Sequence, residues 1–451
     1  MTRALFKKFA DDRRGNVATI FAFSALPLIF SVGMAIDYGT AARLQSKMNA
    51  AADAAVLAGI TPSMLNQTDA VAKAAATNMF NAQVTGLPRL VYDPAANLQV
   101  NVSHPANSPT TRVIQVSYSG QSQNAFAGIL NWQTLPFSGG STGSATSPPN
   151  IDFYLLLDSS PSMAIAGTPA DIQTMVNNTS SQGGCAFACH EAHPSADNLG
   201  NPNGEDNYAL ARNLGVTLRT DLLDSAITDL TNQAYAKQTT ATGGGLPSYR
   251  MSINTFDTAF HQIVPLTSNY VSAWSTQLAS MKSNNTQFQE VYQNNQACAN
   301  SGCTSGTSNS DANTNYDAAM SGITALMPTP GNGTNIGGDT PQEILFIVTD
   351  GVEDENVGGS RQESTMTGSQ DWCTPLKTKG IKIAILYTEY FPLPTNAWYN
   401  AHIAPFQPNI GNTLQSCATS GLFYEVGMGQ DISSALSNLF LAATLSAHLT
   451  H

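Results

Sequence analysis

Three oxygen-bearing side chains at alternate positions, Asp158, Ser160 and Ser162, directly follow the apolar run 153–157 (FYLLL). A short run of this kind is typical of a strand buried on both faces of a parallel sheet. Beyond the carboxyl end of that strand, the carboxylate and the two hydroxyls would face one point. Hard oxygen ligands of this type suit Mg²⁺, Mn²⁺ or Ca²⁺. A metal-free helix cap is the alternative, because Ser and Asp side chains also accept hydrogen bonds from the free N–H groups of a helix start.

A second aspartate, Asp350, follows another apolar run, 344–349 (ILFIVT), and precedes Gly351. Ligands of open α/β sheets bind in the crevice beyond the carboxyl ends of the strands. We therefore expect Asp350 to lie beside Asp158, so that the two carboxylates share one site.

The elements that must position these residues alternate between strands and helices. The predicted strands are 153–157, 249–255, 344–349 and 381–387, and the predicted helices are 208–235, 270–281, 317–327 and 432–449. Short apolar strands that alternate with helices indicate a mostly parallel sheet covered on both faces. The sequence therefore predicts an α/β domain over residues 150–451, with polar loop insertions at 183–206 and 284–313.

The region upstream, residues 37–149, has a different pattern. Residues 41–59 are Ala-rich and predict a long helix, whereas 98–102 and 113–118 alternate in the period-2 manner of half-buried strands. A small α+β unit is expected there. Residues 138–150 are rich in Gly, Ser, Thr and Pro and predict a linker, or a last exposed strand that runs into one, at the domain boundary.

The N-terminus predicts a membrane anchor. Residues 17–36 carry no charge, and twenty helical residues span the ~30 Å hydrocarbon layer. The leader 1–16 holds five basic and two acidic residues, so the positive-inside rule places it in the cytoplasm and everything from Asp37 onward outside. The Ala-rich helix would continue the anchor outward as a stalk. A signal peptide cleaved after Gly33-Met34-Ala35 is the alternative.

Composition excludes several classes of function. The net charge of −12 is unfavourable for binding nucleic acid. Only 11% of the residues are charged, and uncharged polar residues replace the missing charge, which argues against both a polytopic membrane protein and a charged disordered chain. The chain lacks a P-loop and a dinucleotide fingerprint, so neither an enzymatic activity nor a small-molecule substrate is expected.

The cysteines indicate an oxidising compartment such as the periplasm. They fall into three sequence-ordered pairs, and this pairing is the one we expect, although the spacing alone leaves other connectivities open: Cys185 with Cys189, Cys298 with Cys303, and Cys373 with Cys417. Cys189 is followed by two histidines in the segment CHEAH, whose spacing fits neither a haem attachment site nor a hydrolytic zinc helix. A metal-dependent hydrolase is therefore the least expected function.

Two family resemblances extend this interpretation. The D-x-S-x-S of 158–162 with the T-D-G of 349–351 resembles the metal-ion-dependent adhesion site (MIDAS) of von Willebrand factor A domains. The N-terminal stretches 13–18 (RRGNVA), 35–37 (AID) and 51–59 (AADAAVLAG) resemble the TadG-like proteins of the tight adherence (Flp) pilus system. The later stretches 185–190 (CAFACH) and 380–387 (GIKIAILY), together with Cys417, look like the same family.

The MIDAS resemblance implies a further ligand, a threonine from a loop before a helix. Thr314 opens the predicted helix 317–327, whereas Thr334 leaves too few residues before the next strand for a helix, so Thr314 is preferred. The implied ion is Mg²⁺ or Mn²⁺, with Ca²⁺ less favoured because the site offers few carboxylates. A partner carboxylate would fill the open position of the ion. The implied metal ligands are Asp158, Ser160, Ser162, Thr314 and Asp350.

The resemblances together imply a bacterial inner-membrane protein with a single-pass helix. Its fold would be a transmembrane and stalk helix with a small α+β pilin-like unit, then a von Willebrand A domain that is Rossmann-like, with a mostly parallel sheet and disulfide-stapled loop insertions. Its function would be pilus assembly or adhesion, through a protein partner from the pilus or envelope. A structural stalk with an inert A domain is the alternative.

Overall fold

The computed structural model describes residues 15–188, 200–240, 246–283, 314–358, 360–390, 392–394, 397–427 and 429–446. The chain divides into two compact units, Met1–Ser147 and Pro148–His451, and each is described here by itself. Most of the predicted basic leader, residues 1–14, lies outside the described residues.

The first unit is built on one long helix, α2, which spans Gly15–Gly59. The apolar run and the Ala-rich stretch are thus continuous, and Pro27 lies inside the helix without ending it. The portion Thr19–Gly59 is long and apolar enough to cross a membrane by length and composition. Gly59 ends the helix where a side chain would not fit, because a Cβ there would lie 2.1 Å from Ile114 Cδ1.

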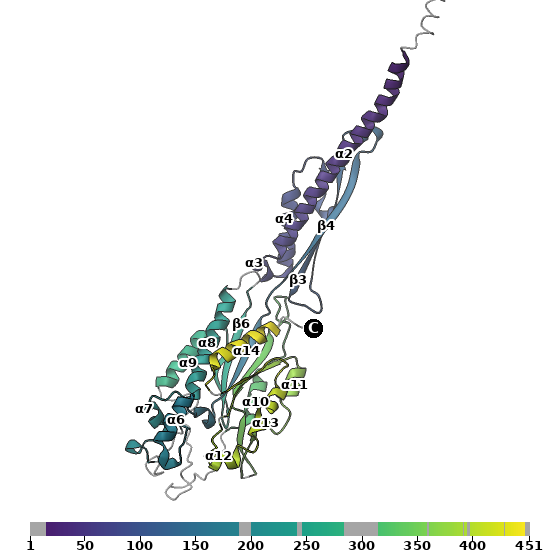
Figure 1. Cartoon of the computed structure of the whole chain (residues 1–451). Helices are drawn as coiled ribbons and strands as arrows, with labels where there is room; N and C mark the ends of the chain where they lie inside the picture. The colour runs from purple at the N-terminus through teal and green to yellow at the C-terminus, as the bar shows by residue number, and fades with distance from the viewer. Residues whose placement is uncertain are drawn as a thin grey trace, which may run out of the picture. The chain divides into compact units, whose positions relative to one another are not determined.

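An antiparallel sheet packs against the C-terminal part of α2 (Figure 1). Strand β3 is central, with β4 on one edge and β1 and β2 on the other. The remaining elements of this unit are α3 (Pro62–Leu65), α4 (Asp69–Val84), β1 (Leu90–Val91), α5 (Pro94–Asn97), β2 (Leu98–Ser103), β3 (Thr111–Gln123), η1 (Ala127–Leu130) and β4 (Thr134–Thr146). Strand β4 includes most of the Gly/Ser-rich segment 138–150. Of the two alternatives for that segment, a linker or a last exposed strand, the structure therefore favours the strand.

The core of the first unit depends on small side chains. Ala52 and Ala55 of α2 and Ala72 and Ala76 of α4 are fully buried, which lets the two helices approach closely. Phe80 fills the space between α4 and the sheet. The predicted α+β unit is therefore present, with α4 as a helix that the sequence reading missed.

The second unit contains a six-stranded sheet in the order β12-β11-β8-β5-β6-β7. All neighbours are parallel except β6 and β7, which are antiparallel. The strands are β5 (Ile151–Asp158), β6 (Tyr249–Phe256), β7 (Phe260–Thr267), β8 (Gln342–Thr349), β11 (Lys382–Thr388) and β12 (Phe423–Val426). The first strand of this unit, β5, lies in the middle of the sheet. The chain adds β6 and β7 on one side of it and then β8, β11 and β12 on the other, which is a doubly wound order with its switch point between β5 and β8.

Helices cover both faces of this sheet, as predicted (Figure 1). One face packs against α8 (Arg219–Thr240), α9 (Tyr270–Ser283) and α14 (Ile432–Ser446). The other face packs against α6 (Pro169–Asn178), α7 (Asn207–Asn213), α10 (Tyr316–Leu326), α11 (Cys373–Thr378), α12 (Ala397–His402) and α13 (Gln407–Cys417). Short 3-10 turns lie at Pro161–Ala164, Ser180–Gln182 and Pro202–Gly204.

Two local expectations for this unit were wrong or incomplete. The predicted helix 208–235 is two helices, α7 and α8, because Gly215 adopts a left-handed φ of 71° between them. The sequence predicts no element for the stretch after Asp350, where β9 (Val352–Val357) and β10 (Ser360–Thr365) form an antiparallel hairpin in which Arg361 pairs with Asp354.

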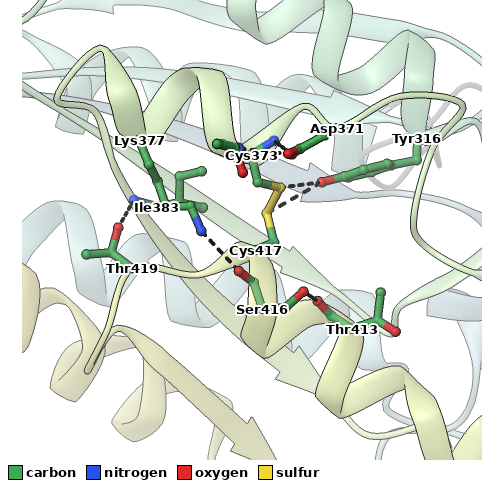
Figure 2. Close-up of a disulfide and its surroundings, with 10 residues drawn as sticks. Tyr316, Asp371, Cys373, Lys377, Ile383, Thr413, Ser416, Cys417 and Thr419 are labelled. Carbon is green, nitrogen blue, oxygen red and sulfur yellow. Dashed lines mark hydrogen bonds between the residues drawn. A yellow bond between two sulfur atoms is a disulfide. The ribbon is translucent and has the colours of Figure 1, made fainter.

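The disulfide between Cys373 and Cys417 is present and joins the start of α11 to the end of α13 (Figure 2). The Tyr316 hydroxyl of α10 lies 3.5 Å from the Cys373 sulfur and 3.7 Å from the Cys417 sulfur. This long-range pairing is therefore confirmed. Cys189, Cys298 and Cys303 lie outside the described residues, so the other two expected pairs do as well.

Candidate functional site

The two predicted aspartates meet at the switch point of the sheet. Strands β5 and β8 are parallel neighbours with Leu157 opposite Val348, which brings Asp158 to the level of Thr349. The Thr349 hydroxyl donates a 2.6 Å hydrogen bond to Asp158 Oδ2. Asp350 is the next residue, and both aspartates are fully buried. The parallel register of two central strands is therefore what brings these carboxylates together.

The turn after Asp158 folds back on that carboxylate. The Ser160 backbone N–H donates to Asp158 Oδ1 at 2.9 Å, and the hydroxyls of Ser160 and Ser162 lie 3.0 Å apart. Ser159 instead bonds the Phe256 carbonyl at the end of β6. Ser160 precedes the 3-10 turn Pro161–Ala164, but its side chain makes no capping hydrogen bond. The metal-free alternative is therefore supported at Asp158, which accepts the Ser160 N–H, but not at Ser160.

Asp350 has one oxygen that the surrounding protein leaves without a hydrogen bond. Its Oδ1 accepts from the Val352 N–H at 3.2 Å, while Oδ2 is buried and accepts no hydrogen bond. The nearest cation is Arg219, whose Nη1 lies 3.9 Å from Asp350 Oδ2. A buried carboxylate oxygen without a hydrogen bond is costly, and a bound cation would relieve that cost.

Arg219 is a site residue that the sequence reading missed. It is the first residue of α8, it is 8% exposed, and its Nη2 donates to the Glu389 carbonyl at 3.1 Å. The sequence offers little signal for it, since its approach to Asp350 depends on how α8 packs on the sheet. Arg219 brings one positive charge to a site with two buried carboxylates.

The pKa shifts follow from this burial. Desolvation, and to a lesser extent the nearby charge of Asp350, raise the pKa of Asp158 to about 7. Desolvation also raises the pKa of Asp350, against the lowering effects of Arg219 and the Ser162 hydroxyl. Burial lowers the pKa of Arg219, and the negative charges of Asp350 and Asp158 partly offset this lowering. Burial therefore disfavours the charged form of both carboxylates. A further cation at the site would stabilise that form.

The two candidate threonines lie at different ends of the sheet. Thr314 is buried just before α10, and its backbone pairs with Asp354 of β9, four residues after Asp350. Within the described residues its hydroxyl makes no hydrogen bond to the other four predicted ligands. Thr334 lies beside Asn150, where β5 begins, and bonds Asp339. Eight strand residues, about 26 Å, separate that end from Asp158.

The donor set fits a hard divalent cation. It offers two buried carboxylates, one of them with an oxygen that accepts no hydrogen bond, and the hydroxyls of Ser160 and Ser162 beside them. In the described part of the chain, no three or more His, Cys, Asp or Glu side chains gather in a way that could hold a metal. A metal at this position would therefore depend on hydroxyl and water ligands in addition to the two acids.

A comparison with known protein families agrees with the N-terminal resemblance. A family model described as "Putative Flp pilus-assembly TadE/G-like" matches residues 15–78. No curated protein matches the chain. The N-terminal segment is thus TadE/G-like. The strand order and the paired aspartates at the switch point give the second unit the α/β architecture expected of a von Willebrand factor A domain.

Three solved structures are similar to this chain at low sequence identity. BatB from Bacteroides thetaiotaomicron has 12% identity over 66% of this chain and 98% of its own, with a TM-score of 0.31. The vWF domain of the type V pili tip protein Mfa5 from Porphyromonas gingivalis has 10% identity over 68% and 98%, with a TM-score of 0.33. Proximal thread matrix protein 1 from the mussel byssus, with a zinc-occupied MIDAS motif, has 12% identity over 66% and 46%, with a TM-score of 0.29.

Proposed function

We propose that this protein is a non-enzymatic, membrane-anchored component of pilus assembly or adhesion, which binds a protein partner through a divalent metal ion. The carrying observation is the convergence of Asp158 and Asp350 at the switch point, with Asp350 Oδ2 buried and without a hydrogen bond. The TadE/G-like match over residues 15–78 supports the pilus context. A protein from the pilus or envelope is the proposed partner.

The proposed metal ligands are Asp158, Ser160, Ser162, Thr314 and Asp350. The bound ion would supply a positive charge with an open coordination position, to which an acidic side chain of the partner would bind. Asp158 and Asp350 hold the charge of the site, while the Thr349 hydroxyl fixes the orientation of Asp158. Mg²⁺ or Mn²⁺ is proposed over Ca²⁺, because few carboxylates are present.

We propose that α2 anchors the protein in the bacterial inner membrane through residues 17–36, with the leader in the cytoplasm and both units outside. The uncharged run and the basic residues before it support this orientation. The Cys373–Cys417 disulfide supports an oxidising compartment for the second unit. Protease added to spheroplasts should then digest the second unit, and its survival would overturn the orientation.

The metal proposal is tested by calorimetric titration of Mg²⁺ and Mn²⁺ into the full-length protein in detergent. Wild type should bind one ion, and Asp158→Asn should lose that binding because a neutral amide replaces one of the two carboxylates. Glu343→Gln is the matched control, since it removes a buried carboxyl from the other end of the same sheet. Equal binding by wild type and Asp158→Asn, with both folded, would contradict the metal site.

One observation favours a second function, that of an inert spacer domain. Arg219 already places a positive charge 3.9 Å from Asp350 Oδ2, so the carboxylates are partly compensated without a metal. In that case the protein would be a structural stalk of the pilus machinery. The same titration separates the two, because an inert domain takes up no Mg²⁺ or Mn²⁺ in the wild type.

A further inference from the structure

The loop that joins β3 to β4, residues 124–133, exposes two large apolar side chains. Ile129 is 72% exposed and Trp132 is 67% exposed. The loop is nonetheless ordered: the Asn124 N–H donates to the Gln133 carbonyl, and the turn η1 (Ala127–Leu130) lies within it. We call residues 124–133 the hairpin tip. An ordered tip that exposes a tryptophan and an isoleucine calls for an apolar or interfacial partner.

The hairpin tip is fastened to α2 where the uncharged run ends. Asp37 is the first charged residue after that run, and its side chain is buried. Its carboxylate accepts three backbone hydrogen bonds from the tip, at 2.7 Å from Ala125, 2.9 Å from Phe126 and 2.8 Å from Ala127. These bonds fix the depth of the tip along the helix axis. The tip therefore lies at the outer end of the proposed membrane span.

A second contact places the tip slightly below Asp37. Gly33 is buried on α2, and a Cβ there would lie 2.6 Å from Phe126 Cβ. Phe126 therefore packs directly on the helix backbone, one turn deeper than Asp37. Gly33 is within the uncharged run 17–36, so the tip overlaps the last turn of that run.

The part of the uncharged run of α2 that precedes its contact with the hairpin tip is too short to span a bilayer. Residues 17–32 precede Gly33, and sixteen helical residues span about 24 Å. The hydrocarbon layer is ~30 Å thick, so the bare helix alone falls about 6 Å short of it. If the helix spans the membrane, the bilayer must reach the level of Gly33 and Phe126. The exposed side chains of the tip would then meet the lipid headgroup region.

The chemistry of the tip suits that position. Residues 113–151 contain no Asp, Glu, Lys, Arg or His, so no charged side chain of the tip would enter the bilayer. Tryptophan concentrates at membrane–water interfaces, where its ring is buried and its N–H stays hydrated. Asn124, Asn131 and Gln133 supply polar groups at the same level. A lipid surface is therefore favoured over a protein partner, because the tip adjoins the span itself.

We propose that the hairpin tip is a second membrane contact, in which Ile129 and Trp132 insert into the outer headgroup region beside α2. This inference rests on the proposed anchoring by residues 17–36. The contact would hold the first unit at a fixed orientation on the membrane, because the unit would then meet the membrane at two points, α2 and the hairpin tip, instead of at α2 alone.

The test uses full-length protein in phosphatidylcholine/phosphatidylglycerol vesicles, with and without lipids brominated near the headgroup. Comparing wild type with Trp132→Phe isolates the emission of Trp132 from that of the other tryptophans. We expect brominated lipid to remove most of the Trp132 emission, and aqueous acrylamide to quench it less in vesicles than in the protein freed of lipid by detergent. Trp372→Phe is the matched control, since Trp372 belongs to the second unit and carries no role in this contact.

Three outcomes would overturn the inference. Quenching of Trp132 by acrylamide but not by brominated lipid would mean that the tip faces water. Protection from both quenchers would mean that a protein, including a second copy of this chain, covers it. Alkaline carbonate extraction identifies the third outcome: if the protein is released from the vesicles, the anchoring proposal fails and this inference fails with it. If the protein is retained, a negative quenching result counts against the hairpin tip alone.

Discussion

The guanidinium of Arg219 lies 3.9 Å from Asp350 Oδ2, beside two buried carboxylates at the carboxyl end of the sheet. Asp158 and Asp350 together bring up to two negative charges, and Arg219 brings one positive charge. A divalent ion bound there would be attracted by the carboxylates and repelled by the guanidinium. Arg219 therefore stabilises the metal-free protein and would weaken its affinity for a metal.

Replacing Arg219 with Gln should therefore strengthen metal binding. Removal of one repelling charge about 6 Å from the ion should raise the affinity for Mg²⁺ by at least about tenfold, because even the dielectric constant of bulk water, about 80, leaves a repulsion of about 1.4 kcal/mol at that distance. Calorimetric titration measures the change. Arg212→Gln is the control, because Arg212 pairs with Asp221 rather than with Asp350. Unchanged affinity in Arg219→Gln would show that the guanidinium does not act on the ion.

The two threonines provide a test of the proposed ligand set. Thr314→Val should weaken Mg²⁺ binding if its hydroxyl is a ligand, because the isosteric methyl cannot coordinate. Thr334→Val should leave binding unchanged, since Thr334 lies beside Asn150 at the opposite end of β5. The same titration compares the two variants. A loss of binding in Thr334→Val alone would reverse the assignment.

The convergence of Asp158 and Asp350 could be predicted because it depends on a local pattern repeated twice. Each aspartate ends a short apolar run, and two parallel strands place their carboxyl ends at one edge. Recognising the two strands and their parallel direction was sufficient to place Asp158 beside Asp350, and the sequence indicates both. The same reasoning predicted the covering helices 208–235, 270–281, 317–327 and 432–449, since their apolar periodicity is local, but it missed the short helices α6, α11, α12 and α13.

Other features depend on contacts that no local pattern reports. Arg219 reaches Asp350 only through the packing of α8, and the Thr314 backbone pairs with Asp354 forty residues later. Strand β7 holds Pro265 and lies at the sheet edge, so its sequence resembles a loop. Asp37 was recognised only as the end of the apolar run. Its three hydrogen bonds come from residues about ninety positions away, which spacing cannot predict.

Glu343 predicts a pH dependence of stability at the amino end of the sheet. It is 1% exposed, and both of its carboxyl oxygens lack a hydrogen bond. Burial, and to a lesser extent the nearby Asp152, raise the pKa of Glu343 to about 8 against the opposing charge of Arg250. The ordinary pKa of 4.5 lies below this value, so the folded protein keeps a proton that the unfolded chain releases. Its contribution to stability is therefore complete below about pH 4.5 and is lost as the pH rises to about 8.

Glu343→Gln should remove this dependence, because the amide does not titrate. Relative to wild type, the variant should gain on the order of 3 kcal/mol in free energy of unfolding at pH 8 and much less at pH 5. Urea unfolding followed by tryptophan fluorescence at the two pH values gives the difference. Glu425→Gln, on the exposed surface of β12, is the charge-matched control. A gain that is equal at both pH values would mean that Glu343 is not the titrating group.

The Cys373–Cys417 disulfide should stabilise the second unit by restricting its unfolded chain. The bond closes a separation of 44 residues, for which chain entropy predicts about 3 to 4 kcal/mol. The double variant Cys373→Ser/Cys417→Ser should lose stability of that order in urea unfolding, and reducing agent should have little further effect on it. Tyr316→Phe is the matched control, because it removes the hydroxyl near both sulfurs while leaving the bond in place. If Tyr316→Phe is as destabilised as the double variant, the packing of α10 against the cysteines, and not the covalent link, accounts for the stability.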